Sequence, residues 1–430
     1  MASRPIRPHR RPREPELLEL TISAVGTHGD GIARYRDADI FVPYTMPGDR
    51  IVAKLVAPHH AVPLEWHARA PAHRTPPCIH FGSCGGCALQ HFDMAEYDAL
   101  KRRQIETALA RRGFPDVTIN ATARSLPAMR RRAEFAAIRR GGRTELGFHA
   151  YKSRQIVDLS SCVVLHPQIT ALLPALRGLA HALLRDGESA DFLITRTESG
   201  VDLLISRRTA PDRAQREAIA EFALAQDLAR IAWRSTAEVP EIIVQRRPAR
   251  ITFGGTTVEF PSGAFLQASE DGESAIVGSV LDGTGPAKRV ADLYAGCGTL
   301  TFPLARQARV HAVEGASELA DALDNAARRS GQAGRISVER RDLSRRPLLA
   351  DELGAFDVIV MDPPREGAAA QAAEIARSTV PVVVYVSCNP ATFARDARLL
   401  ADGGYRLEQV TPIDQFLWST HLEVVGAFAR

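Results

Sequence analysis

The sequence contains no long hydrophobic run. No stretch of its 430 residues approaches the roughly 18 to 20 apolar residues that cross a bilayer. The amino terminus also lacks the apolar stretch of a signal peptide, and prolines at positions 5, 8, 12 and 15 would prevent the amphipathic helix of a transit peptide. Since 45% of the residues are hydrophobic and 24% are charged, the composition excludes a mainly disordered chain. We therefore expect a cytoplasmic protein of two or three domains, with a basic tail at residues 1–13.

The chain also has little net charge, +4 in total, but its positive charge is unevenly distributed. Between Lys101 and Arg143 twelve lysines and arginines stand against three acidic residues. Such a concentration favours a surface that meets the phosphates of a nucleic acid. A solvated helix face would have the same composition, so this segment alone leaves both interpretations open.

Cysteine is scarce, and six cysteines in a cytoplasmic chain are not a disulfide framework. Cys78, Cys84 and Cys87 share one loop rich in Pro and Gly, and Cys162 follows 75 residues later. Four soft thiolates suit a 4Fe-4S cluster or a structural zinc. Zinc sites usually draw their ligands as two close pairs, so three ligands from one loop favour the cluster, while zinc or no metal stays open. Because the fourth cysteine would close the cluster, we expect a structural or RNA-facing role rather than redox chemistry.

The pattern of apolar residues divides the chain into three regions. Short alternating runs separated by Gly and Asp turns predict a small β-barrel over residues 14–71, a type that commonly binds nucleic acid. Residues 72–265 mix helical and less regular strand patterns. From residue 266 to 430 β-branched runs alternate with helical stretches, which predicts a doubly wound, mostly parallel sheet. The last two runs have no helix between them and should pair antiparallel at one edge.

Ligands of such sheets bind at the carboxyl ends of the strands. The first strand ends at Asp292 in a glycine-rich turn that contains Cys297, which we interpret as a packing residue. The second strand ends at Glu314, 22 residues later, where a carboxylate can bind ribose hydroxyls. The turn lacks the Gly-x-Gly-x-x-Gly pattern that cradles a pyrophosphate, which disfavours a dinucleotide. S-adenosylmethionine, which has a ribose but no phosphate, fits better.

Cys388 ends the fifth strand, beside Asn389 and Pro390, at the same edge. A lone cysteine at a strand end is usually a small buried hydrophobe. Methyl transfer to oxygen or nitrogen would not need it, because those atoms are already nucleophilic. Carbon 5 of uracil is not, and a thiolate that adds to carbon 6 makes carbon 5 electron-rich enough to attack a sulfonium methyl group.

In these motifs the chain resembles the RNA uridine-5-methyltransferases, and in particular the iron-sulfur branch that modifies ribosomal RNA. The resemblance runs from a TRAM-type barrel (GDGIARY, FVPYTMPGD) through the cysteine loop to DPPREG, SCNPATFARD and the terminal HLE. It implies an OB-like TRAM barrel, an α+β central domain with the cluster loop, and a Rossmann-like class I methyltransferase domain. It implies a 4Fe-4S cluster on Cys78, Cys84, Cys87 and Cys162. It implies a cofactor and base site formed by Gln267, Tyr294, Thr299, Glu314, Asp342 and Asp362.

The same resemblance implies Cys388 as the nucleophile and Glu423 as the base that removes the carbon 5 proton before the thiolate leaves. Stacked uridine cannot present carbon 6 to a thiolate, so the target base must be flipped out of the RNA. Two segments depart from the family pattern: Thr299 replaces an Asn, and PIDQFLWST precedes HLE in place of a proline-rich form. Related cytosine enzymes carry a second cysteine where this chain has DPPR, which disfavours cytosine.

The expected cofactors are thus S-adenosylmethionine and a 4Fe-4S cluster, and the expected partner is RNA, with ribosomal RNA favoured over transfer RNA. No membrane and no obligate protein partner is implied, and we expect a monomer. The alternatives are 5-methyluridine formation in transfer RNA, a non-catalytic RNA-binding protein that retains the fold, and a nicotinamide-dependent reductase with a cluster.

Overall fold

The computed structural model describes residues 16–235 and 239–430, so the predicted basic tail at residues 1–13 lies outside the described residues. The chain forms two compact units. The first unit contains residues up to Pro76 together with Ala88–Tyr97, and the second contains Pro77–Cys87 and Asp98–Arg430. No helix in the described ranges is long and apolar enough to cross a bilayer.

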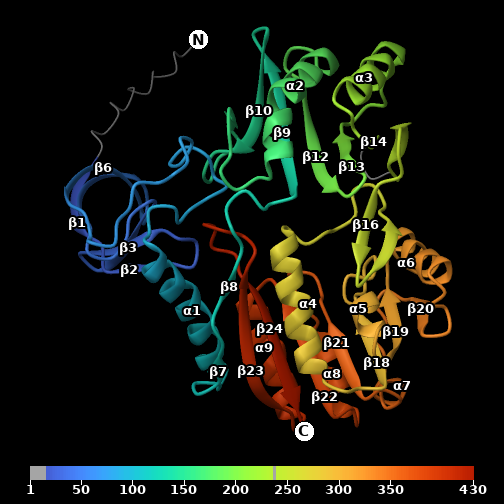
Figure 1. Cartoon of the computed structure of the whole chain (residues 1–430). Helices are drawn as coiled ribbons and strands as arrows, with labels where there is room; N and C mark the ends of the chain where they lie inside the picture. Colours follow the sequence, from blue (N-terminus) through green and yellow to red (C-terminus); the bar gives the residue numbers. More distant parts are fainter. Residues whose placement is uncertain (1–15, 236–238) are drawn as a thin grey trace, which may run out of the picture. The chain divides into compact units, whose positions relative to one another are not determined.

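The first unit is built on an amino-terminal sheet that curls around a small apolar core (Figure 1). Its strands pair mostly antiparallel in the order β1-β5-β6-β4-β3-β2. Alternating apolar residues such as Leu18 and Leu20 turn inward, as the sequence pattern predicted. The strands are β1 (Leu17–Thr21), β2 (Ala24–Val25), β3 (Gly31–Tyr35), β4 (Ala38–Val42), β5 (Arg50–Ala57) and β6 (His60–Ala68).

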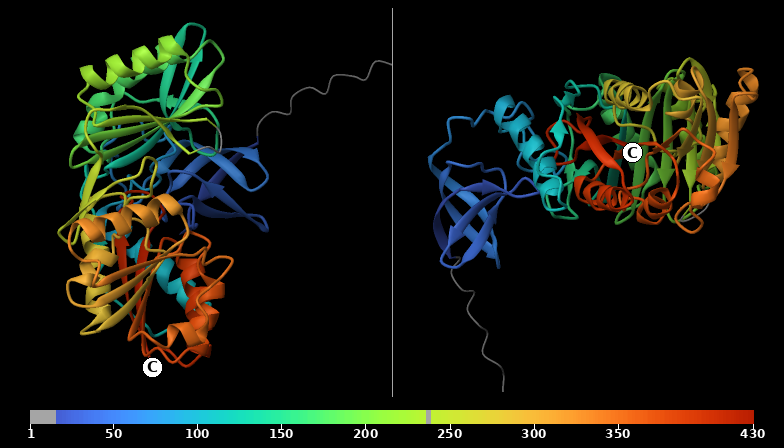
Figure 2. Two further views of the ribbon diagram at one scale, coloured as in Figure 1. Left: turned by 90° about the vertical axis from the view of Figure 1, so that its right-hand side faces the viewer. Right: turned by 90° about the horizontal axis from the view of Figure 1, so that it is seen from below.

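The second unit contains a central sheet with helices on one face. The strands lie in the order β11-β10-β9-β12-β13-β14-β15. Figure 2 shows helices α2 (Pro167–Leu183) and α3 (Arg213–Ala225) across this sheet. Phe192 and Ile194 pack beneath them, whereas Leu193 belongs to a small cluster on the opposite face. The strands are β9 (Arg132–Arg140), β10 (Arg143–His149), β11 (Ile156–Asp158), β12 (Ser189–Thr197), β13 (Gly200–Ser206), β14 (Arg230–Arg234) and β15 (Glu241–Gln245).

The carboxy-terminal sheet has the predicted doubly wound form. Its order is β20-β19-β18-β21-β22-β24-β23, with β18 to β22 parallel and β24 antiparallel. Its strands are β18 (Arg289–Leu293), β19 (Arg309–Glu314), β20 (Ile336–Arg340), β21 (Val358–Met361), β22 (Val382–Ser387), β23 (Arg406–Asp414) and β24 (Glu423–Ala429). A hairpin of β16 (Arg250–Phe253) and β17 (Thr256–Glu259) precedes it.

Helices cover both faces of this sheet, so its strands are apolar throughout. Val290 of β18 lies in one core and its neighbour Ala291 in the other. The helices are α4 (Glu270–Thr284), α5 (Thr301–Ala305), α6 (Ser317–Arg329), α7 (Ala350–Leu353), α8 (Ala369–Arg377) and α9 (Pro390–Asp402). Cys297 is buried in the first of these cores, which agrees with its interpretation as a packing residue.

The last two strands, which the sequence predicted at one edge of this sheet, are not its outermost strands. Strands β23 and β24 do pair antiparallel, but β7 (Thr118–Ile119) and β8 (Ala123–Arg124) pair parallel with β23 on its outer side. The preceding helix α1 (Met94–Ala110) contributes Ile105 to the second core. A segment nearly three hundred residues away in the sequence therefore completes this side of the sheet.

The basic segment from Lys101 to Arg143 does not form one continuous surface. Lys101 is fully buried and paired with Asp414, and Arg131 is buried and paired with Glu273. Several of its cations thus hold the fold together, and the charge count alone overstated the surface available to phosphates.

Candidate active site

The glycine-rich turn after β18 is held by the carboxylate that ends β19. Glu314 accepts the backbone N–H of Gly296 at 2.8 Å and that of Ala316 at 2.7 Å. Gly298 has a φ of +99°, and a Cβ there would lie 2.5 Å from the Phe302 ring, so only glycine fits. A carboxylate offers about four acceptor positions, so Glu314 keeps capacity for further hydrogen bonds.

Asp292 lies beneath this turn with one oxygen unpaired. Its Oδ2 accepts the Thr301 hydroxyl at 2.6 Å, whereas Oδ1 is buried and has no hydrogen-bond partner among residues 16–235 and 239–430. Burial, together with Asp362 and Glu314, raises the pKa of Asp292 to about 7 against the effect of the Thr301 bond. An unpaired buried carboxylate oxygen suits a ligand that brings a cationic donor.

Three further predicted residues lie around this turn. Tyr294, half-buried with a φ of +64°, directly follows β18. Asp342 is exposed and adjoins Gly315, the residue after Glu314, and the Ser344 hydroxyl lowers its pKa. Thr299 is half-buried just before α5. The structure thus gathers these three predicted cofactor residues at one end of the sheet.

Cys388 occupies a strand-to-helix corner. Asn389 caps α9 by accepting the N–H of Ala391 at 3.0 Å, and Pro390 starts the helix. The Asn389 amide also donates to the carbonyl of Arg365 at 3.3 Å, which ties this corner to the DPPR turn after β21. The half-buried Cys388 therefore emerges at the carboxyl end of the sheet, where the sequence predicted it.

A chain of hydrogen-bonded side chains crosses the site. Gln267 donates through Nε2 to Asp362 Oδ2 at 3.2 Å. Gln415 donates through Nε2 to Gln267 Oε1 at 2.6 Å and to Glu423 Oε1 at 3.1 Å. Gln267, Gln415 and Glu423 are each at most 3% exposed. The chain brings Glu423, on the last strand, into one network with Asp362.

The titratable groups of the site influence one another. Burial, then Glu423 and Asp362, raises the pKa of Cys388 to about 11, while Arg365 opposes the rise. Burial and the neighbouring Asp362 raise the pKa of Glu423 to about 8. Burial raises the pKa of Asp362 to about 7, although its bond from Gln267 opposes this. Raised pKa values of carboxyl groups beside a cysteine, at the end of the sheet where such folds bind ligands, are typical of catalytic sites.

Two structural contributors to the site were missed by the sequence analysis. Gln415 lies in the segment noted as a departure from the family pattern, but nothing in that pattern indicated a hydrogen-bonding role. Lys101 donates to Asp414 at 3.2 Å and to the carbonyl of His421 at 2.5 Å. It therefore ties together both ends of the loop between Asp414 and Glu423, a long-range contact with no signal in the sequence.

The four predicted ligand cysteines are all half-buried, free thiols. Burial, then Cys162 and Cys78, raises the pKa of Cys84, whereas a bond from the Gly86 N–H at 3.4 Å lowers it. Burial and Cys78 likewise raise the pKa of Cys162. His80 of the loop also lies 3.1 Å, through Nε2, from the Ser160 hydroxyl, so the loop and the segment that contains Cys162 are neighbours. Within the described ranges no three metal-ligating side chains lie close enough together to hold an ion.

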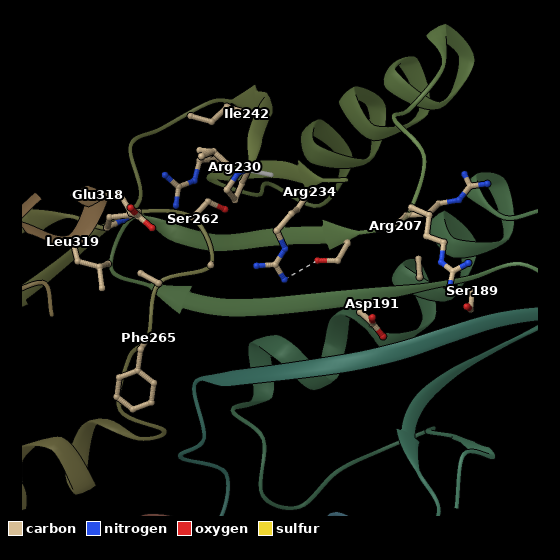
Figure 3. A pocket seen from close by; sticks show the side chains of 18 residues that line it. Ser189, Asp191, Arg207, Arg230, Arg234, Ile242, Ser262, Phe265, Glu318 and Leu319 are labelled. Atoms are coloured by element: carbon tan, nitrogen blue, oxygen red, sulfur yellow. Dashed lines mark hydrogen bonds between the residues drawn. The ribbon is translucent and has the colours of Figure 1, made fainter. Parts of the chain in front are cut away.

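A cavity of about 920 Å³ opens on the uncovered face of the central sheet (Figure 3). Arg234 lies in it and donates to Ser206 at 3.1 Å. Arg208 is exposed there, and Phe265, two residues before Gln267, is 62% exposed on its border. The cavity does not include Cys388 or Glu423. Its lining also includes Ser189, Asp191, Arg207, Arg230, Ser262, Glu318 and Leu319.

Comparison with known proteins agrees with this arrangement. An uncharacterized RNA methyltransferase of Mesorhizobium japonicum is 42% identical over 407 residues, covering 95% of this chain and 97% of the relative. The 23S rRNA (uracil(1939)-C(5))-methyltransferase RlmD of Chromohalobacter salexigens is 33% identical, covering 96% and 89%. The Pyrococcus abyssi tRNA (uracil-54, C5)-methyltransferase, solved with S-adenosyl-L-homocysteine, has the same fold, with a TM-score of 0.73, 21% identity and coverage of 96% and 100%.

The sequence model of the tRNA (uracil-5-)-methyltransferase family matches residues 95–429, most of the chain. The relatives from Mesorhizobium japonicum and Chromohalobacter salexigens, each above 30% identity, are covered over 97% and 89% of their length. The Rossmann-like sheet and the β-rich amino-terminal unit agree with the fold predicted from the sequence. The chain therefore belongs to the tRNA (uracil-5-)-methyltransferase family and is an S-adenosylmethionine-dependent RNA methyltransferase.

Proposed function

We propose that this enzyme forms 5-methyluridine in ribosomal RNA, with Cys388 as covalent nucleophile and Glu423 as base. The observation that carries the proposal is the pairing of Ser387 with Val424, which places Cys388 and Glu423 at the same end of the sheet, where hydrogen bonds through Gln415 and Gln267 link Glu423 to Asp362. The 33% identical relative acts on 23S ribosomal RNA, which favours that substrate. RNA of this kind is found in the cytoplasm, the predicted location.

The reaction begins when Cys388 gives up its proton to the nearby carboxylate of Asp362 and its thiolate adds to carbon 6 of the flipped uracil. The resulting enolate makes carbon 5 nucleophilic. S-adenosylmethionine supplies a sulfonium methyl group, which carbon 5 takes while the neutral thioether leaves. Glu423 then removes the proton from carbon 5, the bond between carbon 6 and sulfur breaks, and Cys388 departs as a thiolate.

The residues of the glycine-rich turn fit S-adenosylmethionine. The unpaired Oδ1 of Asp292 is suited to the ammonium group of the methionine part. Glu314, with acceptor capacity left, is suited to the ribose hydroxyls, and the exposed Asp342 beside it to the adenine. Tyr294 and Thr299 complete the proposed cofactor site.

We further propose that the four cysteines hold a 4Fe-4S cluster. The donor types fit, because all four are thiols, and two of them, Cys84 and Cys162, accept hydrogen bonds from backbone N–H groups. Arg130, whose charge interacts with Cys162 and Cys87, would balance the negative charge of a thiolate-bound cluster. Bound there, the cluster would join the loop at residues 78–87 to the segment at Cys162.

The RNA would be held by parts of the chain on both sides of residue 265. We propose that residues 14–71 are a TRAM barrel that binds RNA, that residues 72–265 bind the strand beside the target, and that residues 266–430 carry the chemistry. Arg208 and Arg234 in the cavity provide charge for phosphates, and exposed Phe265 provides a ring on which a base can stack.

The test is to map methylated uridines in RNA from a strain that lacks the gene. Loss of one 5-methyluridine from 23S ribosomal RNA, restored by the wild-type gene but not by the Cys388→Ala gene, is expected. Loss of 5-methyluridine from transfer RNA instead would show that transfer RNA is the substrate. No loss from either RNA would refute the proposed activity. Iron and sulfide in anaerobically purified protein, absent from the Cys84→Ser variant, test the cluster; zinc without iron would refute it.

A further inference from the structure

The surroundings of Gln415 fix the direction of its side-chain amide. The backbone N–H of Ala268 points at Gln415 Oε1 at 2.8 Å, and a backbone N–H can only donate, so the oxygen must face it. The Nε2 group is left to face Gln267 and Glu423, both of which accept from it. Gln415 has little room to move, because a Cβ at Gly272 would lie 2.5 Å from the Gln415 Cβ.

The orientation of the Gln415 amide also fixes the orientation of the Gln267 amide. Since Gln415 offers hydrogens, Gln267 must turn Oε1 toward it and Nε2 toward Asp362, where the Nε2 to Oδ2 distance is 3.2 Å. Arg131 holds the backbone of this loop by donating its N–H to the Ala268 carbonyl at 2.8 Å and its Nε to the Gln267 carbonyl at 3.2 Å. The second Nε2 hydrogen of Gln267 has no acceptor within the part of the chain that the structure describes.

We propose that Gln415 is a positioning residue that selects uracil over cytosine, by fixing Gln267 as a hydrogen-bond donor in the base site. This inference rests on the function proposed above. Uracil has an acceptor, O4, where cytosine has an amino donor. A glutamine amide has nearly the same shape when turned over, so its neighbours decide whether it offers a donor or an acceptor. With Nε2 directed at Asp362 and the base, Gln267 matches O4 and opposes an amino group.

Two variants of Gln415 distinguish the effect of its hydrogen-bond direction from the effect of its side-chain shape. Gln415→Met keeps the length but removes the donor, so the Gln267 amide is free to turn either way. In Gln415→Glu one oxygen still accepts from Ala268, but the ionised carboxylate cannot donate. The Gln267 Nε2 would then face the introduced carboxylate, and its Oε1 would face Asp362 and the base. Uracil O4 would lose its donor, and the amino group of cytosine would gain an acceptor.

The substrate for the test is the RNA fragment in which the wild-type enzyme forms 5-methyluridine, transcribed with uridine or cytidine at that position. Dissociation constants are measured with S-adenosylhomocysteine over a series of rising pH values, because burial beside other carboxyl groups would raise the pKa of the introduced carboxyl as it raises that of Glu423. We expect Gln415→Met to lower the uridine-to-cytidine affinity ratio by about five- to a hundredfold, the cost of one mismatched buried hydrogen bond. Gln415→Glu should lower the ratio further.

Gln371→Met is the matched control. Gln371, in α8, is also fully buried, and both of its amide atoms pair with the backbone of Leu348 and not with Gln267 or Glu423. Its replacement should lower the melting temperature without changing the ratio. Weaker binding of both RNAs at an unchanged ratio in both Gln415 variants would overturn the inference.

If the Gln415 variants fail to fold, Gln267→Glu tests the same donor directly, because it replaces Nε2 with an oxygen. An unchanged ratio in that variant would also overturn the inference. Failure of the proposed function is distinguishable, since the wild-type enzyme would then form no 5-methyluridine in any RNA.

Discussion

Replacing Glu423 with glutamine should trap the methylated base on the enzyme. The glutamine side chain in Glu423→Gln keeps an Oε1 that can accept from Gln415 Nε2, as Glu423 does at 3.1 Å, so the local packing survives. It cannot remove a proton. Addition of Cys388 and methyl transfer should proceed, whereas elimination stops, and the RNA should remain bonded through Cys388.

The expected loss depends on pH because burial raises the pKa of Glu423 to about 8. Loss of a general base typically costs about a hundred- to ten-thousandfold. At pH 7 only about one tenth of the Glu423 side chains would be ionised, so the wild-type enzyme already works below its maximum. The difference between wild type and Glu423→Gln should therefore be about tenfold larger at pH 9 than at pH 7.

The assay uses S-adenosylmethionine with a labelled methyl group and a denaturing gel. Protein, RNA and label should migrate together for Glu423→Gln and separate for the double variant with Cys388→Ala. The stability of the folded protein supplies a control. Folding raises the pKa of the Glu423 carboxyl from 4.5 to about 8. Ionisation of this buried group therefore lowers the free energy of unfolding increasingly as pH rises through that range. Glu423→Gln should thus gain melting temperature over wild type between pH 5 and 8. Normal turnover by this variant would mean that another residue is the base.

Four further outcomes are expected. Cys388→Ala should bind S-adenosylmethionine and RNA but transfer no methyl group; measurable methylation would rule out the covalent route. Wild-type turnover should fall about tenfold for each pH unit below about 8, because Glu423 must be ionised; a flat profile would contradict this role. Lys101→Met should lower the free energy of unfolding by about 3–5 kcal/mol in denaturant titrations, since it leaves Asp414 buried without its cation. Arg365→Gln should slow adduct formation severalfold, because Arg365 lowers the pKa of Cys388; an unchanged rate of adduct formation would contradict that reason.

The carboxy-terminal fold could be predicted because its signals are local. Each strand is a short β-branched run, and the residues at the strand ends, Asp292, Glu314, Asp362 and Cys388, follow from the period and the flanking turns. Once the sheet is parallel, these ends must meet at one edge. The site therefore follows from the topology, without knowledge of any single contact.

Contacts between distant segments could not be predicted in the same way. The pairing of β7 with β23 places Thr118 opposite Gln409. Strand β7 has only two residues, so it is too short to show the alternation of apolar residues that identifies a strand. Lys101 was counted as surface charge because its sequence neighbours are basic, yet its partner Asp414 is 313 residues away. The net charge of a segment gives the excess of cations over anions but does not show which of the cations face solvent.

The order of the pKa values in the site explains why the Cys388 thiol is unreactive when no base is bound. Burial and two nearby carboxyl groups make Cys388 hold its proton more tightly than Asp362 or Glu423 hold theirs. At neutral pH the cysteine is therefore a thiol, and thiols react slowly with oxidants and alkylating agents. An ionised carboxylate nearby can take the proton, but this transfer is unfavourable unless the thiolate is consumed at once by carbon 6. In the proposed mechanism, activation of Cys388 is therefore coupled to the arrival of a flipped base, and Asp362, one of the carboxyl groups that suppress the free thiolate, accepts the proton when the base is in place.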